Sequence, residues 1–440
     1  MGVYLLYICM AATALAAIYR PWIGVVAAYV FVVLTPQCIW YWDFAGIRPV
    51  FWTLVPTLLG IIIAFVRGDL DITRLMSRQS LFILTLWFCF VLSSFAGPYV
   101  NVNVHRVFQV AWVRGLVDNI FLLYFAAILL IDSEKKLKYL AAVMTLSTIY
   151  LIYWCNHQYL AHLQFGRIEG PGGISGGGTY TDQNAFAMLF VTGLPFLYYF
   201  GFYFANSLYR CALWLFLPLG WHAIFLTGSR GGLLGLCVTL LVITFRSSRK
   251  FMGVGLILLF VVAYQMEAGS LMKSRADTID NYQHDGSAEG RIQAWNAAMK
   301  MIEDHPVTGV GLASFEPAFP HYSIHHPRAT HNTFFQIAAE SGLTAGITYL
   351  LMLFAILLDL WQTGSRMKRE DAIYRGNFPY CLNEALLTAF IGFGVCAIFL
   401  PLGLYEMFYF MCAMAAALTC IVKRLATTEE SASGCAVLVA

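Results

Sequence analysis

Long apolar runs without a single charged side chain constrain this chain more than any other feature. Phe251–Gln265 and Leu343–Leu358 are two such runs. Across the chain 60% of the residues are hydrophobic and only 12% are charged. Hydrocarbon offers no water to the backbone, so a segment that crosses a bilayer must satisfy its hydrogen bonds internally, as a helix does. The sequence therefore predicts an all-α, polytopic integral membrane protein.

The apolar runs divide the chain into an N-terminal bundle, one large loop and a C-terminal bundle. We predict 12 transmembrane helices and allow a thirteenth, because the first two runs are the least clear. The predicted regions are a bundle over 1–266, a large loop containing short helices over 267–330, C-terminal spans over 331–424 and a cytoplasmic tail over 425–440. The apolar segments are 3–19, 22–40, 50–66, 80–96, 115–131, 137–155, 184–204, 210–226, 230–245, 251–266, 333–358, 384–400 and 404–422.

Basic residues are concentrated in alternate loops, which orients the bundle. Short cytoplasmic loops carry an excess of Lys and Arg, so the positive-inside rule places these loops in the cytoplasm. The loop 267–330 then lies on the opposite, external side, where short loops hold only scattered cations. The basic set is Arg67, Arg74, Arg78, Lys135, Lys136, Lys138, Arg246, Arg249, Lys250, Arg366, Lys368, Arg369, Arg375, Lys423 and Arg424, and the scattered cations are Arg48, Arg106, Arg114 and Arg167.

Several kinds of site are disfavoured by composition and spacing. The eleven cysteines are scattered and none lies in the large loop, which argues against a disulfide framework. That loop has five Lys/Arg and eight Asp/Glu, so nucleic acid is not an expected partner. The glycine-rich tract Gly170–Gly178 lacks the Lys-Ser/Thr ending of a phosphate-binding loop. Six of the ten histidines lie between His284 and His331, but their spacing matches no metal motif, so we expect no metal.

Within the large loop, Ala288–Asp304 has the periodicity of an amphipathic helix. Its predicted N-cap is Ser287, and Arg291 lies in its first turn. Helical spacing predicts one apolar stripe that would face the membrane surface or the bundle. This stripe consists of Ile292, Trp295, Met299 and Ile302.

The loop enters the next apolar run through the polar segment Thr330–Gln336. On a helix, Asn332, Gln336 and Glu340 would form one polar stripe with His331 at its outer end. Polar groups at the mouth of a membrane helix are costly unless they face a cavity or one another. The stripe is either a cap with interhelical hydrogen bonds or a functional site in which His331 acts as a base near neutral pH.

Arg230 provides a third element on the external side. It follows the short turn Thr227–Ser229 and begins an apolar run, where a guanidinium can simply reach the headgroups. Together with Arg291 and His331, however, it offers a cradle for a diphosphate, since arginine matches phosphate oxygens bidentately and stays charged.

At these residues the chain resembles the O-antigen ligase and polymerase superfamily of bacterial envelope enzymes. The resemblance extends over most of the chain from about residue 170. Among its members the chain looks most like the ligases, and Thr179–Asn184, which contains Asp182 and Asn184, also resembles ligases of exopolysaccharide or protein-sorting systems. The pieces that carry the resemblance are Thr227–Gly232, Gly290-Arg291 with Trp295, His305–Gly311, His331–Gln336 and Glu340–Leu343.

The resemblance implies a membrane glycosyltransferase of GT-C-like architecture in the bacterial inner membrane. Its donor would be a glycan on undecaprenyl diphosphate, its acceptor the lipid A–core oligosaccharide, and its active site would face the periplasm. Polymerases and protein O-oligosaccharyltransferases share this loop design, so the acceptor remains open.

The residues suit that chemistry without a cofactor or metal. Arg230 and Arg291 would bind the donor diphosphate and stabilise its developing charge. His331 would remove the acceptor proton, supported by Asn332, Gln336, Glu340, Asp182 and Asn184. One direct displacement inverts the anomeric centre. The competing class is a lipid-linked glycan transporter, which would place ionisable residues near mid-membrane instead of at span ends.

Overall fold

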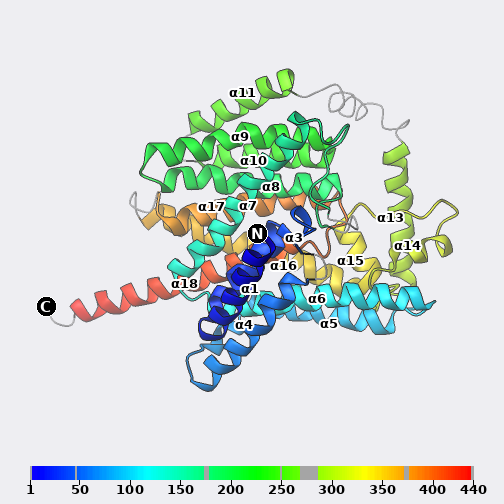
Figure 1. Ribbon diagram of the computed structural model, residues 1–440, viewed down its shortest axis with the longest axis horizontal. Helices are drawn as coiled ribbons and strands as arrows, with labels where there is room; N and C mark the ends of the chain where they lie inside the picture. The colour runs from blue at the N-terminus through cyan, green and yellow to red at the C-terminus, as the bar shows by residue number, and fades with distance from the viewer. Residues whose placement is uncertain are drawn as a thin grey trace.

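The computed structural model is built from helices (Figure 1). It describes residues 2–44, 47–172, 178–247, 250–267, 286–370 and 376–437. No β-strand occurs within these ranges, so the predicted all-α class is confirmed. Arg249, Arg375, His284 and most of the glycine-rich tract lie outside them.

Nine helices of the described residues are long and apolar enough to cross a membrane. Three shorter apolar helices are Tyr4–Tyr19, Pro21–Val33 and Lys250–Met266. A polytopic membrane protein is thereby confirmed. The bundle helices are α1 Gly2–Tyr19, α2 Pro21–Val33, α4 Pro49–Val66, α5 Arg78–Ala96, α6 Val104–Leu130, α7 Glu134–Leu160, α8 Gln183–Tyr203, α9 Ser207–Thr227, α10 Arg230–Arg246, α11 Lys250–Glu267, α16 Leu343–Glu370, α17 Phe378–Ala397 and α18 Glu406–Val437.

Several helices differ from the predicted segments. The segment 115–131 begins 11 residues earlier, at Val104, so Arg106 and Arg114 lie within α6 and not in a loop. The segment 22–40 breaks at Thr35, before the short helix α3 Pro36–Ile39. The segment 333–358 is two helices, because Gly342 with φ +89° separates α15 Thr333–Ser341 from α16. The segment 384–400 begins six residues earlier, at Phe378, so Glu384 lies inside α17 and not at its end.

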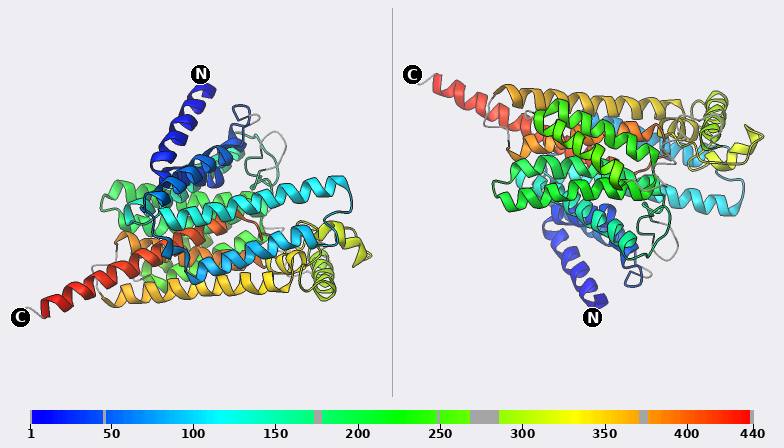
Figure 2. Two further views of the ribbon diagram at one scale, coloured as in Figure 1. Left: turned by 90° about the horizontal axis from the view of Figure 1, so that it is seen from below. Right: turned by 90° about the horizontal axis from the view of Figure 1, so that it is seen from above.

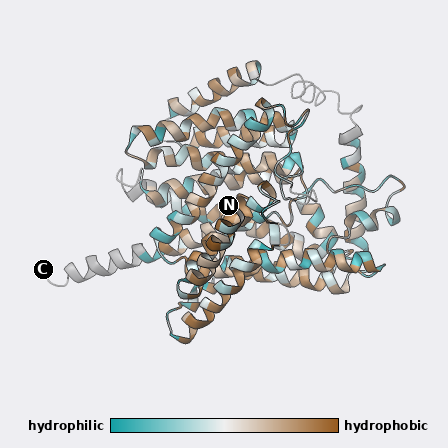
Figure 3. Cartoon of the chain, in the orientation of Figure 1, coloured by the Kyte–Doolittle hydropathy of each residue, from teal (hydrophilic) through white to brown (hydrophobic). Residues whose placement is uncertain are grey.

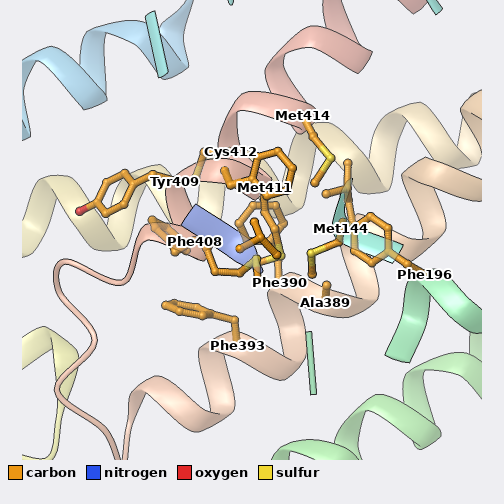
Figure 4. Close-up of a cluster of buried hydrophobic side chains, with 14 of the residues drawn as sticks. Met144, Phe196, Ala389, Phe390, Phe393, Phe408, Tyr409, Met411, Cys412 and Met414 are labelled. Atoms are coloured by element: carbon orange, nitrogen blue, oxygen red, sulfur yellow. The ribbon is translucent and has the colours of Figure 1, made fainter. Parts of the chain in front are cut away.

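α8 and α17 form the centre of the bundle. Both are almost entirely buried, and α8 packs between α9 and α17. Their side chains meet those of α18 and α7 in a cluster of aromatic rings and sulfur atoms, with Phe393 and Phe408 stacked at 4.7 Å between ring centroids (Figure 4). α1 packs on α2 and α4, and its N-terminal end projects from the bundle (Figure 2).

The basic loops gather at one end of the bundle, here called the basic end. Arg74 donates to the Ile131 carbonyl at the end of α6 (3.3 Å). Lys138 at the start of α7 lies 5.3 Å from the Phe378 ring at the start of α17. Arg246 at the end of α10 pairs with Glu384. These contacts place the loops that the positive-inside rule groups together on one side of the molecule.

The large loop lies at the opposite end, called the site end, where hydrophilic residues are more frequent (Figure 3). Its main helix, α13 Gly286–Asp304, packs on α15 and is followed by α14 Phe315–Ala318. Ser287 lies inside α13, so the predicted N-cap is wrong.

The predicted apolar stripe of α13 is buried in part: Trp295 and Ile302 pack against the core of the large loop, whereas its other two residues do not. Ile292 and Met299 are 51% and 44% exposed, whereas small residues of the neighbouring face are buried. Small side chains let α13 approach α15 closely. This close contact determines which face of α13 is buried, and that face is not the one with the largest apolar residues. The buried positions are Ala294, Ala297, Ala298 and Met301.

Candidate active site

The segment His305–Gly311 fastens the large loop to α15 and α5. Val310 donates its N–H to the Ala339 carbonyl (2.8 Å) and accepts from Tyr99 N–H (3.1 Å). Gly309 has φ +64°, and a Cβ there would lie 2.3 Å from the Glu340 carbonyl carbon. Only glycine fits that approach. The motif therefore fixes the loop against the helix that carries Gln336 and Glu340.

His331 is held between two anchored neighbours. Trp295 of α13 donates its indole N–H to the Thr330 carbonyl (3.0 Å). Asn332 caps α15, accepting from the N–H groups of Phe334 (2.9 Å) and Phe335 (3.0 Å). His331 itself has φ +46°, a left-handed conformation that is costly for most side chains. The two contacts hold the imidazole at the junction of loop and helix.

The electrostatic surroundings keep the imidazole of His331 neutral. Burial lowers its pKa, and the nearby Arg291 guanidinium lowers it further, while the Asp182 carboxylate opposes both. Its buried Nδ1 atom has no hydrogen-bond partner among the described residues. A lowered pKa favours the neutral imidazole, which is the protonation state that a general base needs.

The two predicted arginines approach a common residue, Phe399. The Arg291 guanidinium carbon lies 5.9 Å from the centre of the Phe399 ring. Arg230 is the first residue of α10, which Ser229 caps by accepting from Gly232 N–H (3.1 Å). A Cβ on the next residue, Gly231, would touch Phe399 at 3.5 Å. Helices α10 and α13, far apart in sequence, thus bring one arginine each to this point.

Arg167 is a residue that sequence reasoning missed. It donates to the Thr227 carbonyl (2.8 Å) and to Asn184 Oδ1 (3.2 Å). It therefore connects the turn before Arg230 with the start of α8. The sequence grouped Arg167 with scattered external cations, and only its loop position next to the glycine-rich tract hinted at a role.

Asp182 combines a structural contact with an electrostatic one. Its Oδ1 atom caps α8 by accepting from the N–H groups of Asn184 (2.8 Å) and Ala185 (2.9 Å). It is also close enough to His331 to raise the pKa of the imidazole. The cap thus fixes a carboxylate that favours the protonated imidazole as it forms.

Two adjoining hollows open beside these groups. One, about 360 Å³, has Asp182 and Tyr405 in its wall. The other, about 480 Å³, has Arg106 and Thr330 in its wall. Both are lined by Ala313, Gln336, Glu340 and Pro401. Two residues of the predicted polar stripe, Gln336 and Glu340, therefore face cavities, while Asn332 is used as the N-cap of α15.

Glu340 is the buried carboxyl shared by the two hollows. Burial raises its pKa to about 7, although the N–H groups of Phe315 and Ala313 lower it. Phe315 N–H lies 3.2 Å from Glu340 Oε1. The side chain thus joins α15 to the loop around α14. Gln336 Oε1 lies 3.4 Å from Gly403 N–H, on the other side of the hollows.

The other loop histidines within the described ranges do not form a cluster. His321 packs on the Tyr99 ring at 5.1 Å between ring centres, and His325 and His326 are exposed. No group of three His, Cys, Asp or Glu residues suited to a metal ion occurs in the described part of the chain.

Residues 211–350 match the family model described as O-Antigen ligase. No curated protein matches the chain. The matched segment contains Arg230, Arg291 and His331, and it leaves Asp182 and Asn184 outside. It confirms the resemblance to the O-antigen ligase superfamily and, with it, a membrane glycosyl-transfer enzyme of the O-antigen ligase or polymerase kind.

Proposed function

We propose that this enzyme of the O-antigen ligase superfamily transfers O-antigen polysaccharide from undecaprenyl diphosphate to the lipid A–core oligosaccharide. The transfer takes place at the periplasmic face of the bacterial inner membrane, without metal and with inversion. The observation that carries the proposal is the partly buried His331, whose pKa burial and Arg291 lower, within the electrostatic reach of Asp182. A base and a fixed cation in one place are what transfer from a diphosphate donor requires.

In the proposed mechanism the acceptor hydroxyl oxygen attacks the anomeric carbon of the donor glycan. The bond from that carbon to the diphosphate oxygen breaks, and the hydroxyl proton moves to His331. Arg230 and Arg291 bind the diphosphate and stabilise the negative charge that develops on it. Asp182 stabilises the imidazolium that forms. A single displacement on the face opposite the diphosphate inverts the anomeric configuration.

The test of the function is transfer by the purified protein in detergent, from a glycan on undecaprenyl diphosphate. Three acceptors are compared: lipid A–core, a second lipid-linked glycan and a peptide. Transfer to lipid A–core alone supports the ligase. Extension of the second lipid-linked glycan identifies a polymerase, and transfer to the peptide identifies a protein oligosaccharyltransferase. If no acceptor is glycosylated, while vesicles containing the protein translocate the donor, the function is transport.

Replacing Arg230 or Arg291 by lysine is expected to slow transfer. Lysine keeps the charge and loses the bidentate fork that matches phosphate oxygens. A lost charge-assisted contact is worth about 1.5–3 kcal/mol, which corresponds to roughly one to two decades in rate or affinity. Donor affinity and transfer rate are measured for both variants. The matched control is Lys300→Ala, which removes an exposed cation from the same helix as Arg291. Wild-type rates in both lysine variants would contradict the proposed role of the two arginines in diphosphate binding.

The orientation of the site end is testable by labelling a cysteine at Ile324. Ile324 is 99% exposed in the large loop, so a thiol there meets a water-soluble reagent freely. The basic loops lie at the opposite end, and the positive-inside rule places them in the cytoplasm. In cells whose other exposed cysteines are replaced, Ile324→Cys is expected to react with a reagent that cannot cross the inner membrane. Reaction only after the inner membrane is broken would place the site end in the cytoplasm, which contradicts the predicted orientation.

A further inference from the structure

The larger hollow of about 480 Å³ contains polar groups that the proposed catalytic steps do not use. It lies between the first turns of α6, the loop around α14 and the face of α15 that carries Gln336 and Glu340. Its volume falls within the roughly 300–1,000 Å³ typical of small-molecule sites. The polar side chains in its wall are Arg106, Gln109, Glu316, Thr330, Gln336 and Glu340.

Two buried polar atoms in this wall have no hydrogen-bond partner within the described ranges. They are Nε of Arg106 and Oγ1 of Thr330, on side chains of residues that are 6% and 2% exposed. Arg106 is held in place by its other nitrogens, since Nη2 donates to the Ala313 carbonyl and to Ser314 Oγ, both at 2.8 Å. Native structures rarely leave buried polar atoms unpaired, and a bound molecule is one way in which they are satisfied.

The charges in the wall indicate what kind of molecule fits. The wall contains one guanidinium, on Arg106, and the carboxyl groups of Glu316 and Glu340; the Glu316 carboxylate would repel a phosphate or carboxylate that Arg106 attracts. Hydroxyl groups both donate and accept. Sugar hydroxyls can therefore donate to the carboxyl oxygens and can also form hydrogen bonds with the side-chain amides of Gln109 and Gln336. The wall is chemically matched to an uncharged saccharide.

The hollow is also placed correctly for an acceptor. Thr330 in its wall directly precedes His331, and Gln336 and Glu340 continue into the smaller hollow that Asp182 lines. The Arg291 guanidinium lies over the Phe399 ring, and Gly231, next to Arg230, approaches the same residue, which lines neither hollow. A sugar in the larger hollow would thus approach His331 from a different direction than a diphosphate held by the arginines.

We propose that the hollow between α6, α14 and α15 is the acceptor-sugar subsite and that it selects an uncharged, hydroxyl-rich terminal sugar. Thr330 and Arg106 hydrogen-bond to it, and Glu316 disfavours a phosphorylated one. This inference rests on the proposed function, but saccharide binding can be measured without transfer.

The experiment is equilibrium binding of uncharged hexose-terminated oligosaccharides, and of their 6-phosphate esters, to the full-length protein in detergent. We expect the uncharged forms to bind at least about 10-fold more tightly than the esters. Glu316→Gln is expected to reduce this ratio of affinities. Thr330→Val removes one hydroxyl at nearly constant shape. A neutral hydrogen bond is worth about 0.5–1.5 kcal/mol, so affinity should fall roughly 3–10-fold.

The matched control is Thr308→Val, the same change in the same loop outside the hollow. It is expected to bind the uncharged oligosaccharide as the wild type does. The subsite is overturned if no uncharged oligosaccharide binds saturably, if Thr330→Val leaves affinity unchanged, or if the phosphate ester binds more tightly. Failure of the ligase proposal gives a different result from failure of the subsite. In that case saccharide binding persists, but no glycan is transferred to any acceptor.

Discussion

Replacing His331 by asparagine is expected to lower single-turnover glycan transfer by about 10²–10⁴-fold while donor binding stays intact. Asparagine is the better substitution here because His331 has φ +46°, a left-handed conformation that asparagine tolerates and alanine resists. Its amide cannot accept a proton near neutral pH. The loss therefore reports on proton transfer, and backbone strain contributes little to it.

The competing explanation is that His331 only supports the junction between the large loop and α15. In that case His331→Asn lowers the thermal stability of the protein in detergent, and transfer falls only in proportion to the folded fraction. Thermal stability, undecaprenyl-diphosphate binding and single-turnover transfer are therefore measured on the same preparation. Near-normal transfer by a folded variant would exclude a catalytic base at this position.

The pH dependence of transfer gives a second readout of the same residue. Burial and Arg291 lower the pKa of His331 below its ordinary value of 6.5. The imidazole is then neutral at pH 7 and gains a proton only as the pH falls below the usual histidine range. We expect the wild-type rate to hold at neutral pH and to decline in acid, and this acid limb to be absent from His331→Asn.

The sequence was sufficient for the positions of the bundle helices, because a long uncharged apolar run has few alternatives to a helix in a membrane. It also located Arg230, Arg291 and His331, since short polar motifs at the ends of apolar runs are conspicuous. The structure places Arg291 and His331 within electrostatic reach of each other, and both arginines beside Phe399.

Features set by close packing were not predictable in the same way. The buried face of α13 consists mainly of alanines, which carry little hydrophobic signal, and depends on the surface of α15. Arg106 and Arg167 have roles only because the loop around α14 and the turn before Arg230 fold onto them. Such contacts join residues far apart in sequence, and no local pattern records them.

The ion pair between Glu384 and Arg246 is another contact between residues far apart in sequence. Removing Arg246 is expected to destabilise the protein strongly. The Glu384 carboxylate is fully buried in the second turn of α17 and accepts from Arg246 Nε (2.8 Å) and Nη2 (2.5 Å). The Arg246 guanidinium also lies 4.5 Å from the Trp361 ring centre. One bidentate pair thus joins the ends of α10, α16 and α17 at the basic end.

Arg246→Ala leaves the buried carboxylate without that guanidinium, and removing one partner of a buried pair typically costs about 3–5 kcal/mol. The free energy of unfolding, measured by reversible denaturation in mixed micelles, is expected to fall by that amount.

The matched control is Arg78→Ala, which breaks the pair with Asp359. Arg78 is 52% exposed there, and such a pair is worth at most about 1 kcal/mol. The double variant Arg246→Met with Glu384→Met should recover much of the loss, because no buried charge then remains. If Arg246→Ala costs no more than the control, other neighbours satisfy the carboxyl of Glu384, and the pair does not stabilise the fold.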